Sequence, residues 1–378
     1  MIKKILIISS FFENHVGYQE VQFAETLTSM GYEVKVIATN RSNLDLEKRY
    51  EDSNEKFEVK RIKNLTRIKN TFYPKENLSE FIGKFSPDLV FLILPGSGIP
   101  YFLLKEINSN AKVISVFSDT TIENRVHNAK GTKGNKVIFS LLKARWYIKV
   151  FERCDLILAN TNETAEILKN ISKKNLDEKL RTYGLGFDSN KYFYSGNLRK
   201  AARNELGLND DKKLIVTISR IYEGKPFEFW VEQIKAFLLQ NDEYVYLLAG
   251  FNNTEYSKKT EKKINEFGFK NKVILHKFTA PEETNKIFNA ADYSLWFAPT
   301  ISIQQSMATG VFAIAPFDST LDHLIENNKT GLYYNDFNDL KNKLESLNNI
   351  HYDREANAKF NEKFSYQNIL QKAISEVS

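Results

Sequence analysis

Apolar and polar residues follow two different periods along the first half of the chain. Short apolar runs such as residues 4–9 and 88–94 are typical of strands that are buried on both faces of a sheet. Residues 19–30 instead repeat apolar side chains at helical spacing, and Gly31 follows as a helix stop. The pattern predicts strands at 4–9, 33–38, 57–62, 88–94, 112–117, 156–159 and 179–183, and helices at 19–30, 78–85, 100–107, 136–153 and 163–169. This alternation predicts a parallel, doubly wound α/β sheet with helices on both faces.

The alternation starts again after a polar and aromatic stretch at residues 187–200. It predicts strands at 214–218, 244–249, 273–276, 293–297, 312–315 and 331–334, and helices at 199–206, 229–239, 256–266, 281–289, 303–308, 321–326, 337–347 and 366–376. A chain of 378 residues is too long for one ordinary core, so two domains are expected. We expect a Rossmann-like domain at 1–186, to which residues 364–378 return, and a second one at 187–363. The strand ends of the two domains are expected to face a cleft, with a linker near 186–198.

Composition narrows the class of protein. Hydrophobic residues make up 42% of the chain, which is typical of a globular protein, and the net charge of +6 is too diffuse to indicate nucleic-acid binding. No run approaches 18 apolar residues, so no transmembrane helix is expected, and residues 1–8 are interpreted as a first strand rather than a signal peptide. The single cysteine, Cys154, excludes an internal disulfide and favours a cytoplasmic location.

Two cations follow the first strand of the second domain. Arg220 and Lys225 come directly after the buried run 214–218. Ligands of open α/β sheets bind outside the carboxyl ends of the strands. An Arg fork and a Lys point charge at such a position favour a ligand that carries phosphate. The alternative is a solvated turn with two surface charges.

A second candidate site lies where the predicted strand 293–297 passes through a Pro-Thr turn into a helix. Ser302 and Gln305 have the spacing of a capping box at the start of this helix. Free amides at a helix start favour a phosphate or sugar hydroxyls, which makes Thr300, Ile301 and Ser302 candidates for ligand binding. The alternative is a structural helix in which Gln305 only closes the box.

The order of these motifs resembles the large group of retaining GT-B glycosyltransferases of the group 1 / family 4 type. That group shows an Arg and a Lys after the first strand of its carboxyl domain, a strand ending in Gly, an Ala-Asp pair, an E-x7-E loop with Met-Ala-x-Gly, and a late Thr-Gly-Leu. The matching positions are Arg220 and Lys225, Leu248-Ala249-Gly250, Ala290-Ala291-Asp292, Gln305-Ser306-Met307-Ala308-Thr309-Gly310, and Thr330-Gly331-Leu332. In the amino domain, Gly17-Tyr18-Gln19-Glu20 resembles the group's first loop, and Gly184-Leu185-Gly186-Phe187-Asp188 its entry into the linker.

The chain also departs from the group's pattern. Gln305 replaces the second Glu of E-x7-E, and the position of the first Glu, eight residues earlier, is Phe297. Ser219 and Pro226 replace the two glycines around the cationic pair, and Ser118-Asp119 takes the place of a His-Asp pair. A Gln amide can still bind a pair of hydroxyl groups, although without charge assistance.

The resemblance implies a metal-independent enzyme without a cofactor, whose donor substrate is a nucleoside diphosphate sugar, UDP or GDP. Arg220, Lys225 and Asp119 are then the predicted catalytic residues. The predicted donor-binding residues are Gly17, Arg220, Lys225, Gly250, Phe278, Thr300, Ile301, Ser302 and Gln305. The donor would bind mainly to the carboxyl domain, while Gly17 and Asp119 of the acceptor-binding amino domain form the facing wall.

Basic residues and a Trp gather at 130–149, which predicts a peripheral contact with an anionic membrane surface. The alternative is an amphipathic helix with a solvated charged face. Together these features predict a cytoplasmic glycosyltransferase, peripheral on the inner face of the plasma membrane. It would act on a glycan or lipid-linked acceptor in surface polysaccharide or glycolipid biosynthesis. A non-catalytic GT-B partner or glycan-binding subunit, a sugar-nucleotide epimerase and a phosphorylase of the same fold are the alternatives.

Overall fold

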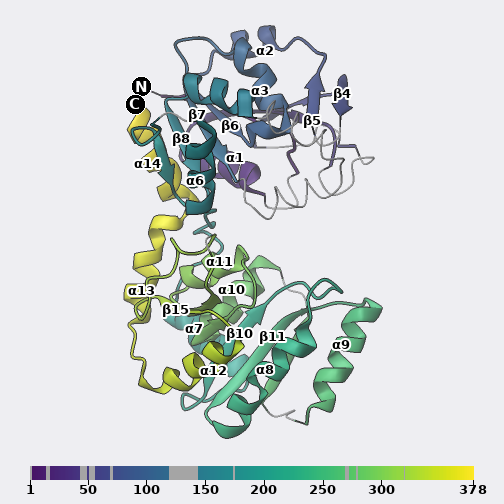
Figure 1. Ribbon diagram of the computed structural model, residues 1–378, viewed down its shortest axis with the longest axis vertical. Helices are drawn as coiled ribbons and strands as arrows, with labels where there is room; N and C mark the ends of the chain where they lie inside the picture. Colours follow the sequence, from purple (N-terminus) through teal and green to yellow (C-terminus); the bar gives the residue numbers. More distant parts are fainter. Residues whose placement is uncertain are drawn as a thin grey trace. The chain divides into compact units, whose positions relative to one another are not determined.

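The chain forms two compact units, which are described one at a time. The computed structural model describes residues 2–13, 18–42, 49–50, 56–68, 71–118, 144–172, 175–268, 272–277, 280–318 and 320–378. One unit contains residues 1–186 together with 366–378, and the other contains residues 187–365 (Figure 1). Each unit is built around its own parallel sheet, as predicted for two doubly wound domains.

The sheet of the first unit has seven described strands in the order β3-β2-β1-β6-β7-β8-β9, and all its neighbours are parallel. The strands are β1 (Lys4–Ile8), β2 (Glu33–Thr39), β3 (Glu58–Ile62), β6 (Leu89–Ile93), β7 (Lys112–Phe117), β8 (Leu156–Ala159) and β9 (Leu180–Thr182). All five residues of β6 are buried, because helices cover both faces of the sheet.

Helices cover each face of this sheet with its own apolar cluster. α2 (Ser79–Phe85), α3 (Ile99–Leu103), the helical residues 144–153 and α6 (Asn162–Ser172) pack on one face. α1 (Gln19–Ser29) and α14 (Tyr366–Val377) pack on the other. Short 3-10 turns occupy Pro95–Ser97 and Leu104–Glu106. An antiparallel hairpin of β4 (Leu65–Ile68) and β5 (Thr71–Pro74) was not predicted, because its strands are only four residues long.

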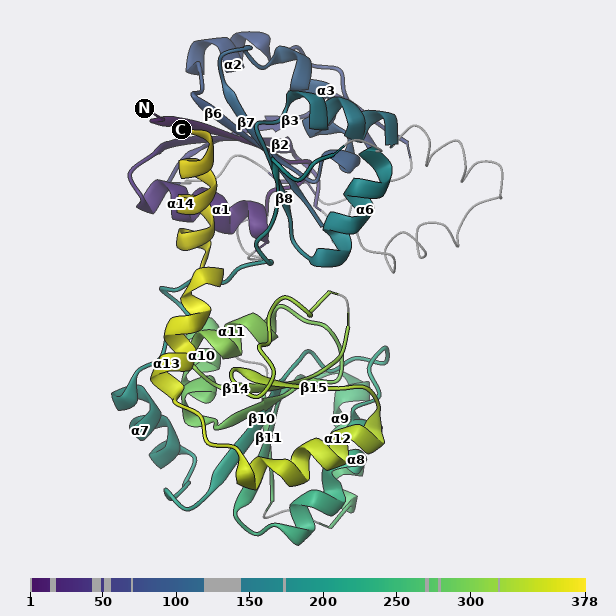
Figure 2. The ribbon, with the colours of Figure 1, turned by 60° about the vertical axis from the view of Figure 1, so that its left-hand side comes forward.

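The carboxyl-terminal helix α14 packs against α1, which confirms the predicted return of the chain end (Figure 2). The ring of Tyr366 lies edge-on to Phe23 at 6.0 Å, and Leu370 and Ile374 continue the same buried cluster. Gly186, the last residue before the second unit, lies against this ring and has a φ of +89°. A Cβ atom added at this position would lie 2.5 Å from a Tyr366 ring carbon, so only glycine fits at position 186.

The sheet of the second unit has six described strands in the order β12-β11-β10-β13-β14-β15, again all parallel. The strands are β10 (Lys213–Ile218), β11 (Tyr244–Phe251), β12 (Val273–Lys277), β13 (Tyr293–Leu295), β14 (Phe312–Pro316) and β15 (Gly331–Tyr334). The helices α7 (Gly196–Glu205), α10 (Pro281–Ala290) and α11 (Ser302–Ala308) pack on one face. On the other face lie α8 (Phe227–Gln240), α9 (Glu255–Glu266) and α12 (Phe337–Ser346).

The predicted helix at 321–326 is wrong. These residues form turns, because side chains of the following strand satisfy their backbone: the Tyr333 hydroxyl donates to the carbonyl of Leu321 and accepts from the Ile325 amide at 3.1 Å. The Thr330 hydroxyl accepts from the Glu326 amide at 2.9 Å.

One helix was not predicted, α13 (Arg354–Asn361). Its N-cap Asp353 accepts from two backbone amides. A 3-10 turn follows it at Glu362–Phe364. A further 3-10 turn follows α12 at Leu347–Asn349.

No helix among the described residues is long and apolar enough to cross a bilayer.

Candidate functional site

The two predicted cations lie on one loop at the carboxyl edge of the second sheet. β10 ends at Ile218, and the Lys225 ammonium returns to its end, donating to the Ser219 hydroxyl at 2.5 Å. The Lys225 amide donates to the Tyr222 carbonyl at 3.0 Å, and the Tyr222 ring centre lies 5.6 Å from the ammonium. Arg220 is exposed and Lys225 is half-buried. The loop therefore places one exposed and one half-buried cation at a strand end.

The electrostatics of this loop favour an anionic ligand. Burial lowers the pKa of Lys225, and the neighbouring charge of Arg220 lowers it further. A negative charge placed beside the ammonium would oppose both effects and raise this pKa again.

Gly250 lies at the same carboxyl edge of the sheet, next to the start of the cationic loop. The Ser219 amide donates to the carbonyl of Ala249 at 3.0 Å, which brings the loop onto the end of β11. Gly250 has a φ of +128°, a conformation that L-residues rarely adopt. The sequence placed Gly250 among the donor-binding residues, and the structure brings it together with Arg220 and Lys225 through the backbone of Ser219.

The loop between β13 and α11 holds the other described candidates, but not as a capping box. Ile301 is the N-cap of α11 and has helical φ and ψ of −58° and −28°, so Ser302 already lies in the first helical turn. An N-cap side chain needs extended backbone to reach the following amides, and the N-cap Ile301 makes no such bond. The Thr300 hydroxyl, one residue earlier, accepts from the Ser302 amide at 3.5 Å. Thr300 and Gln305 are half-buried here. Within the described structure, Gln305 does not close a capping box with this helix start.

A buried polar network fixes this loop from inside, and the sequence did not indicate it. The hydroxyls of Ser294 and Ser306 lie 3.0 Å apart, and the Trp296 indole donates to Ser294 at 3.0 Å. The Tyr334 hydroxyl donates to the Trp296 carbonyl at 2.8 Å. These groups are buried, so their hydrogen bonds specify one path for the chain between β13 and α11.

Asp292, the acid of the Ala-Asp motif, has a structural role at the opposite edge of the sheet. It precedes β13 and accepts from Arg199 at 2.6 Å, from Arg203 at 3.2 Å and from the Leu214 amide at 2.7 Å. Arg203 is almost fully buried. These bonds join α7 to the starts of β10 and β13, so this motif positions the sheet rather than a ligand.

Three predicted site residues, Gly17, Asp119 and Phe278, lie outside the described residues, and so does the basic stretch 130–143. In the described remainder of that stretch, the half-buried Trp146 stacks on Tyr101 at 5.0 Å and lies edge-on to Tyr73 and Phe102. The alternative interpretation of a packed amphipathic helix therefore accounts for Trp146.

The first unit contains a buried carboxyl group that sequence reasoning missed. Glu20 lies in the first turn of α1, is 7% exposed, and makes no hydrogen bond to another described residue. Burial, followed by the charge of Glu13, raises its pKa to about 7 against the smaller opposing effect of its own backbone amide. Glu13 is itself buried and accepts from Ser42 at 3.0 Å and from Tyr50 at 2.8 Å. Helical spacing counts only apolar positions, so it gave no signal for this glutamate.

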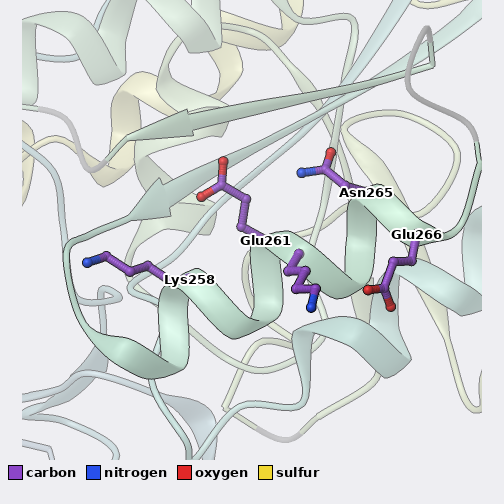
Figure 3. Close-up of a pocket in the computed structure, with 5 residues that line it drawn as sticks. Lys258, Glu261, Asn265 and Glu266 are labelled. Atoms are coloured by element: carbon purple, nitrogen blue, oxygen red, sulfur yellow. The ribbon is translucent and has the colours of Figure 1, made fainter.

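A pocket along α9 contains no residue of the cationic loop after β10 (Figure 3). It is lined by Lys258, Glu261, Lys262, Asn265 and Glu266. Its two cations and two anions come from a single helix, and none of the predicted site residues lines it. Among the described residues, no group of His, Cys, Asp or Glu side chains could hold a metal ion.

Comparisons with known proteins agree with this architecture. The chain is similar to sucrose-phosphate synthase from Thermosynechococcus elongatus, with a TM-score of 0.65, 16% identity, and coverage of 99% of this chain and 98% of that one. It is similar to a glycosyltransferase from Rickettsia africae, with a TM-score of 0.64, 14% identity, and 99% and 97% coverage. It also resembles HepE from Anabaena in complex with UDP and glucose, with a TM-score of 0.60, 15% identity, and 99% coverage of both chains. At these identities the likeness shows the GT-B fold. No curated protein matches the sequence.

Two family models match consecutive parts of the sequence. The model of glycosyltransferase family 4 matches residues 19–188, and the model of glycosyl transferases group 1 matches residues 199–365. Together they account for almost the whole chain and correspond to its two sheets. The chain therefore belongs to the group 1 / family 4 glycosyltransferases, a retaining, metal-independent GT-B family that transfers sugars from nucleotide-sugar donors.

Proposed function

We propose that this enzyme transfers a sugar, with retention, from a UDP- or GDP-sugar to a glycan or lipid-linked acceptor. The observation that carries this proposal is the pair of cations, Arg220 and Lys225, on one loop at the carboxyl end of β10. The donor diphosphate binds there. Charge develops on this diphosphate as the sugar leaves, so fixed positive charge lowers the barrier.

The neighbouring loop completes the donor site in this proposal. The amide of Gln305 binds the ribose hydroxyls, and Thr300 to Ser302 bind the sugar or a phosphate oxygen. The side chain of Gln305 is half-buried and makes no capping bond, which supports a role toward a ligand. Phe278 and Gly250 contribute to the same nucleotide site.

The first unit binds the acceptor in this proposal. By the family resemblance, Gly17 contributes to donor binding, and Asp119 orients the acceptor or takes its proton. The setting is surface polysaccharide or glycolipid synthesis on the cytoplasmic side of a membrane, which the basic residues of 130–149, without Trp146, contact. Similar structures support this setting, because they include the lipopolysaccharide outer core galactosyltransferase WaaB and WaaG, a glycosyltransferase involved in lipopolysaccharide biosynthesis.

A non-catalytic glycan-binding subunit is the second candidate. One observation favours it: Gln305 and Phe297 stand where active relatives of this group carry glutamates. Such a subunit would bind nucleotide sugars without hydrolysing or transferring them. An epimerase of the same fold would interconvert donors without any acceptor, so product analysis with and without acceptor separates these activities.

The test compares wild type with Lys225→Ala and with Lys259→Ala, which removes an exposed cation of α9. UDP and GDP binding is measured by calorimetry, and donor hydrolysis and transfer are measured with UDP- and GDP-sugars. We expect Lys225→Ala to weaken catalysis by roughly 2–4 kcal/mol, the scale of losing one charged stabiliser. Lys259→Ala should behave as wild type. Near-normal transfer by Lys225→Ala would remove the assigned role, and binding without any turnover in wild type would indicate the non-catalytic subunit.

A further inference from the structure

Three aromatic side chains follow three neighbouring strands at the carboxyl edge of the second sheet. Tyr222 follows β10, Phe297 follows β13 and Phe317 follows β14, and these strands are adjacent in the sheet. Tyr222 is 48% exposed and Phe317 is 61% exposed, while Phe297 is half-buried between them in sheet order. The Phe317 ring lies edge-on to Tyr333, with ring centroids 5.6 Å apart. The edge that carries the cationic pair is therefore also aromatic.

Phe297 is held in place by a stacked partner. Its ring lies parallel to that of Trp230, with centroids 4.9 Å apart and an interplanar angle of 8°. Trp230 comes from the first turn of α8 and packs edge-on against the buried Phe227. The residue before Phe297 is Trp296, which is fixed by its hydrogen bonds to Ser294 and Tyr334. Both the backbone and the ring of Phe297 are thus preorganised.

This part of the edge offers few groups that could bind a sugar hydroxyl. Residues 296–301 carry no charged side chain. On the next strand, Asp318 already accepts from the Thr320 amide at 2.8 Å and from its hydroxyl at 2.6 Å. Glu223 is exposed on the loop after β10. From the end of β13 to the first residue of α11, the only hydroxyl groups are those of Thr300 and Ser302. A ligand group that faces Phe297 meets an apolar surface.

We propose that the donor sugar of this enzyme carries a methyl group that packs on Phe297, either the methyl of a 6-deoxy sugar or that of an acetamido group. This inference rests on the proposed donor site. A methyl group gains by leaving water for an aromatic surface, whereas a hydroxyl group in the same position loses its hydrogen bonds to water without replacement. Phe297 is thereby a specificity-determining residue for the sugar, separate from the cations that bind the diphosphate.

Matched donor pairs test this inference with the full chain. Calorimetry compares UDP-N-acetylglucosamine with UDP-glucose, and GDP-rhamnose with GDP-mannose, so that the acetamido and the 6-deoxy methyl are examined separately. In at least one pair we expect the methyl-bearing donor to bind about 10-fold more tightly, the scale of one added apolar group in a pocket. Phe297→Glu should abolish or reverse this preference and leave the affinity for UDP or GDP alone within about 2-fold. Leu239→Glu, which adds the same charge to a 53% exposed residue at the far end of α8, should change nothing.

The possible results distinguish a failure of the sugar preference from a failure of the proposed nucleotide site. Equal affinities within both pairs, or tighter binding of the hydroxylated donors, would overturn the inference while leaving the nucleotide site intact. A preference that survives in Phe297→Glu would also overturn it, since another residue must then select the sugar. Failure of wild type to bind UDP, GDP or any of the four donors would overturn the proposed function itself, and the inference with it.

Discussion

A Cβ atom at position 250 would lie 1.8 Å from the carbonyl oxygen of Ser219. Real Cβ atoms never approach backbone oxygen so closely, so the end of β11 and the start of the cationic loop can coexist only if residue 250 is glycine. The positive φ of Gly250 adds a second requirement for the same residue. The position of Arg220 and Lys225 is therefore determined partly by a residue on the neighbouring strand.

Gly250→Ala should displace this loop. We expect a loss of at least about 2 kcal/mol in the free energy of unfolding, because both a steric overlap and an unfavourable φ are introduced. UDP and GDP affinity should fall in the protein that remains folded. The measurements are urea unfolding and calorimetry. Gly268→Ala is the matched control, since Gly268 also has a positive φ but its Cβ would meet nothing within 4 Å; it should cost only about 1 kcal/mol and leave nucleotide binding unchanged.

Asp292→Asn should destabilise the second unit without altering the donor site. The substitution leaves the buried Arg203 without a compensating charge, and we expect a loss of roughly 3 kcal/mol in the free energy of unfolding. Nucleotide affinity of the folded protein should stay at the wild-type level, because Asp292 lies at the opposite edge of the sheet. Glu80→Gln, which breaks an exposed pair with Lys84, should cost less than about 0.5 kcal/mol. Reduced affinity in Asp292→Asn would contradict the structural role.

Glu20→Gln should make the first unit more stable at neutral and higher pH. The pKa of Glu20 is raised to about 7, so the folded state favours the protonated carboxyl group. Below about pH 4.5 the carboxyl group is protonated in both the folded and the unfolded state, so it does not change the free energy of unfolding. As the pH rises toward 7, the free energy of unfolding falls, and above that the total loss stays at about 3 kcal/mol. The variant should lose this decline, as followed by urea unfolding between pH 4.5 and 8. Glu25→Gln on the exposed side of α1 should retain it. Equal pH profiles for wild type and Glu20→Gln would be inconsistent with a buried carboxyl group.

His323 should make the second unit less stable in acid. Both nitrogens of its ring are buried, and neither makes a hydrogen bond within the described structure. The Asp322 carboxylate lies 3.8 Å from Nδ1. Burial lowers its pKa to about 4, against the opposing effect of Asp322 and with a small contribution from Lys363. Above about pH 6.5 the ring is neutral in both states and does not lower the free energy of unfolding. As the pH falls toward 4, the unfolded state binds a proton first, and the free energy of unfolding falls by about 3 kcal/mol. His323→Leu should remove this slope in urea unfolding, whereas His351→Leu, at an exposed position, should leave it unchanged.

The sequence was sufficient to predict strands that are buried on both faces of a sheet, because almost every residue of such a strand is apolar. All of β6 is apolar, and so is β10 apart from Lys213 and Thr217, so their position, type and parallel pairing follow from the pattern alone. The cationic loop could be predicted for a similar reason, because two charges directly after a buried run must lie at a strand end. The return of α14 to the first unit also has a local signal in its strongly one-sided apolar spacing.

The errors arose where tertiary partners override local pattern. Residues 321–326 have helical spacing, but the Tyr333 hydroxyl binds their backbone from a strand that follows several residues later. Ser302 has the spacing of a capping residue, yet the chain is already helical at Ile301, because the buried network around Trp296 fixes the path of the loop. Neither the stack of Phe297 on Trp230 nor the isolation of Glu20 leaves a signal in sequence spacing, since both depend on contacts between elements.

The position of α14 also determines the order in which the two units become complete during synthesis. Leu370, Ile374 and Val377 belong to the same buried cluster as Ile5, Val21 and Phe23. A ribosome that has passed residue 365 has supplied every segment of the second unit, while the first unit still lacks one of the helices that cover its sheet. The amino-terminal sheet is therefore begun first and completed last. Until then, the apolar surface beside α1 stays uncovered on the nascent chain, where it is available to chaperones or to aggregation.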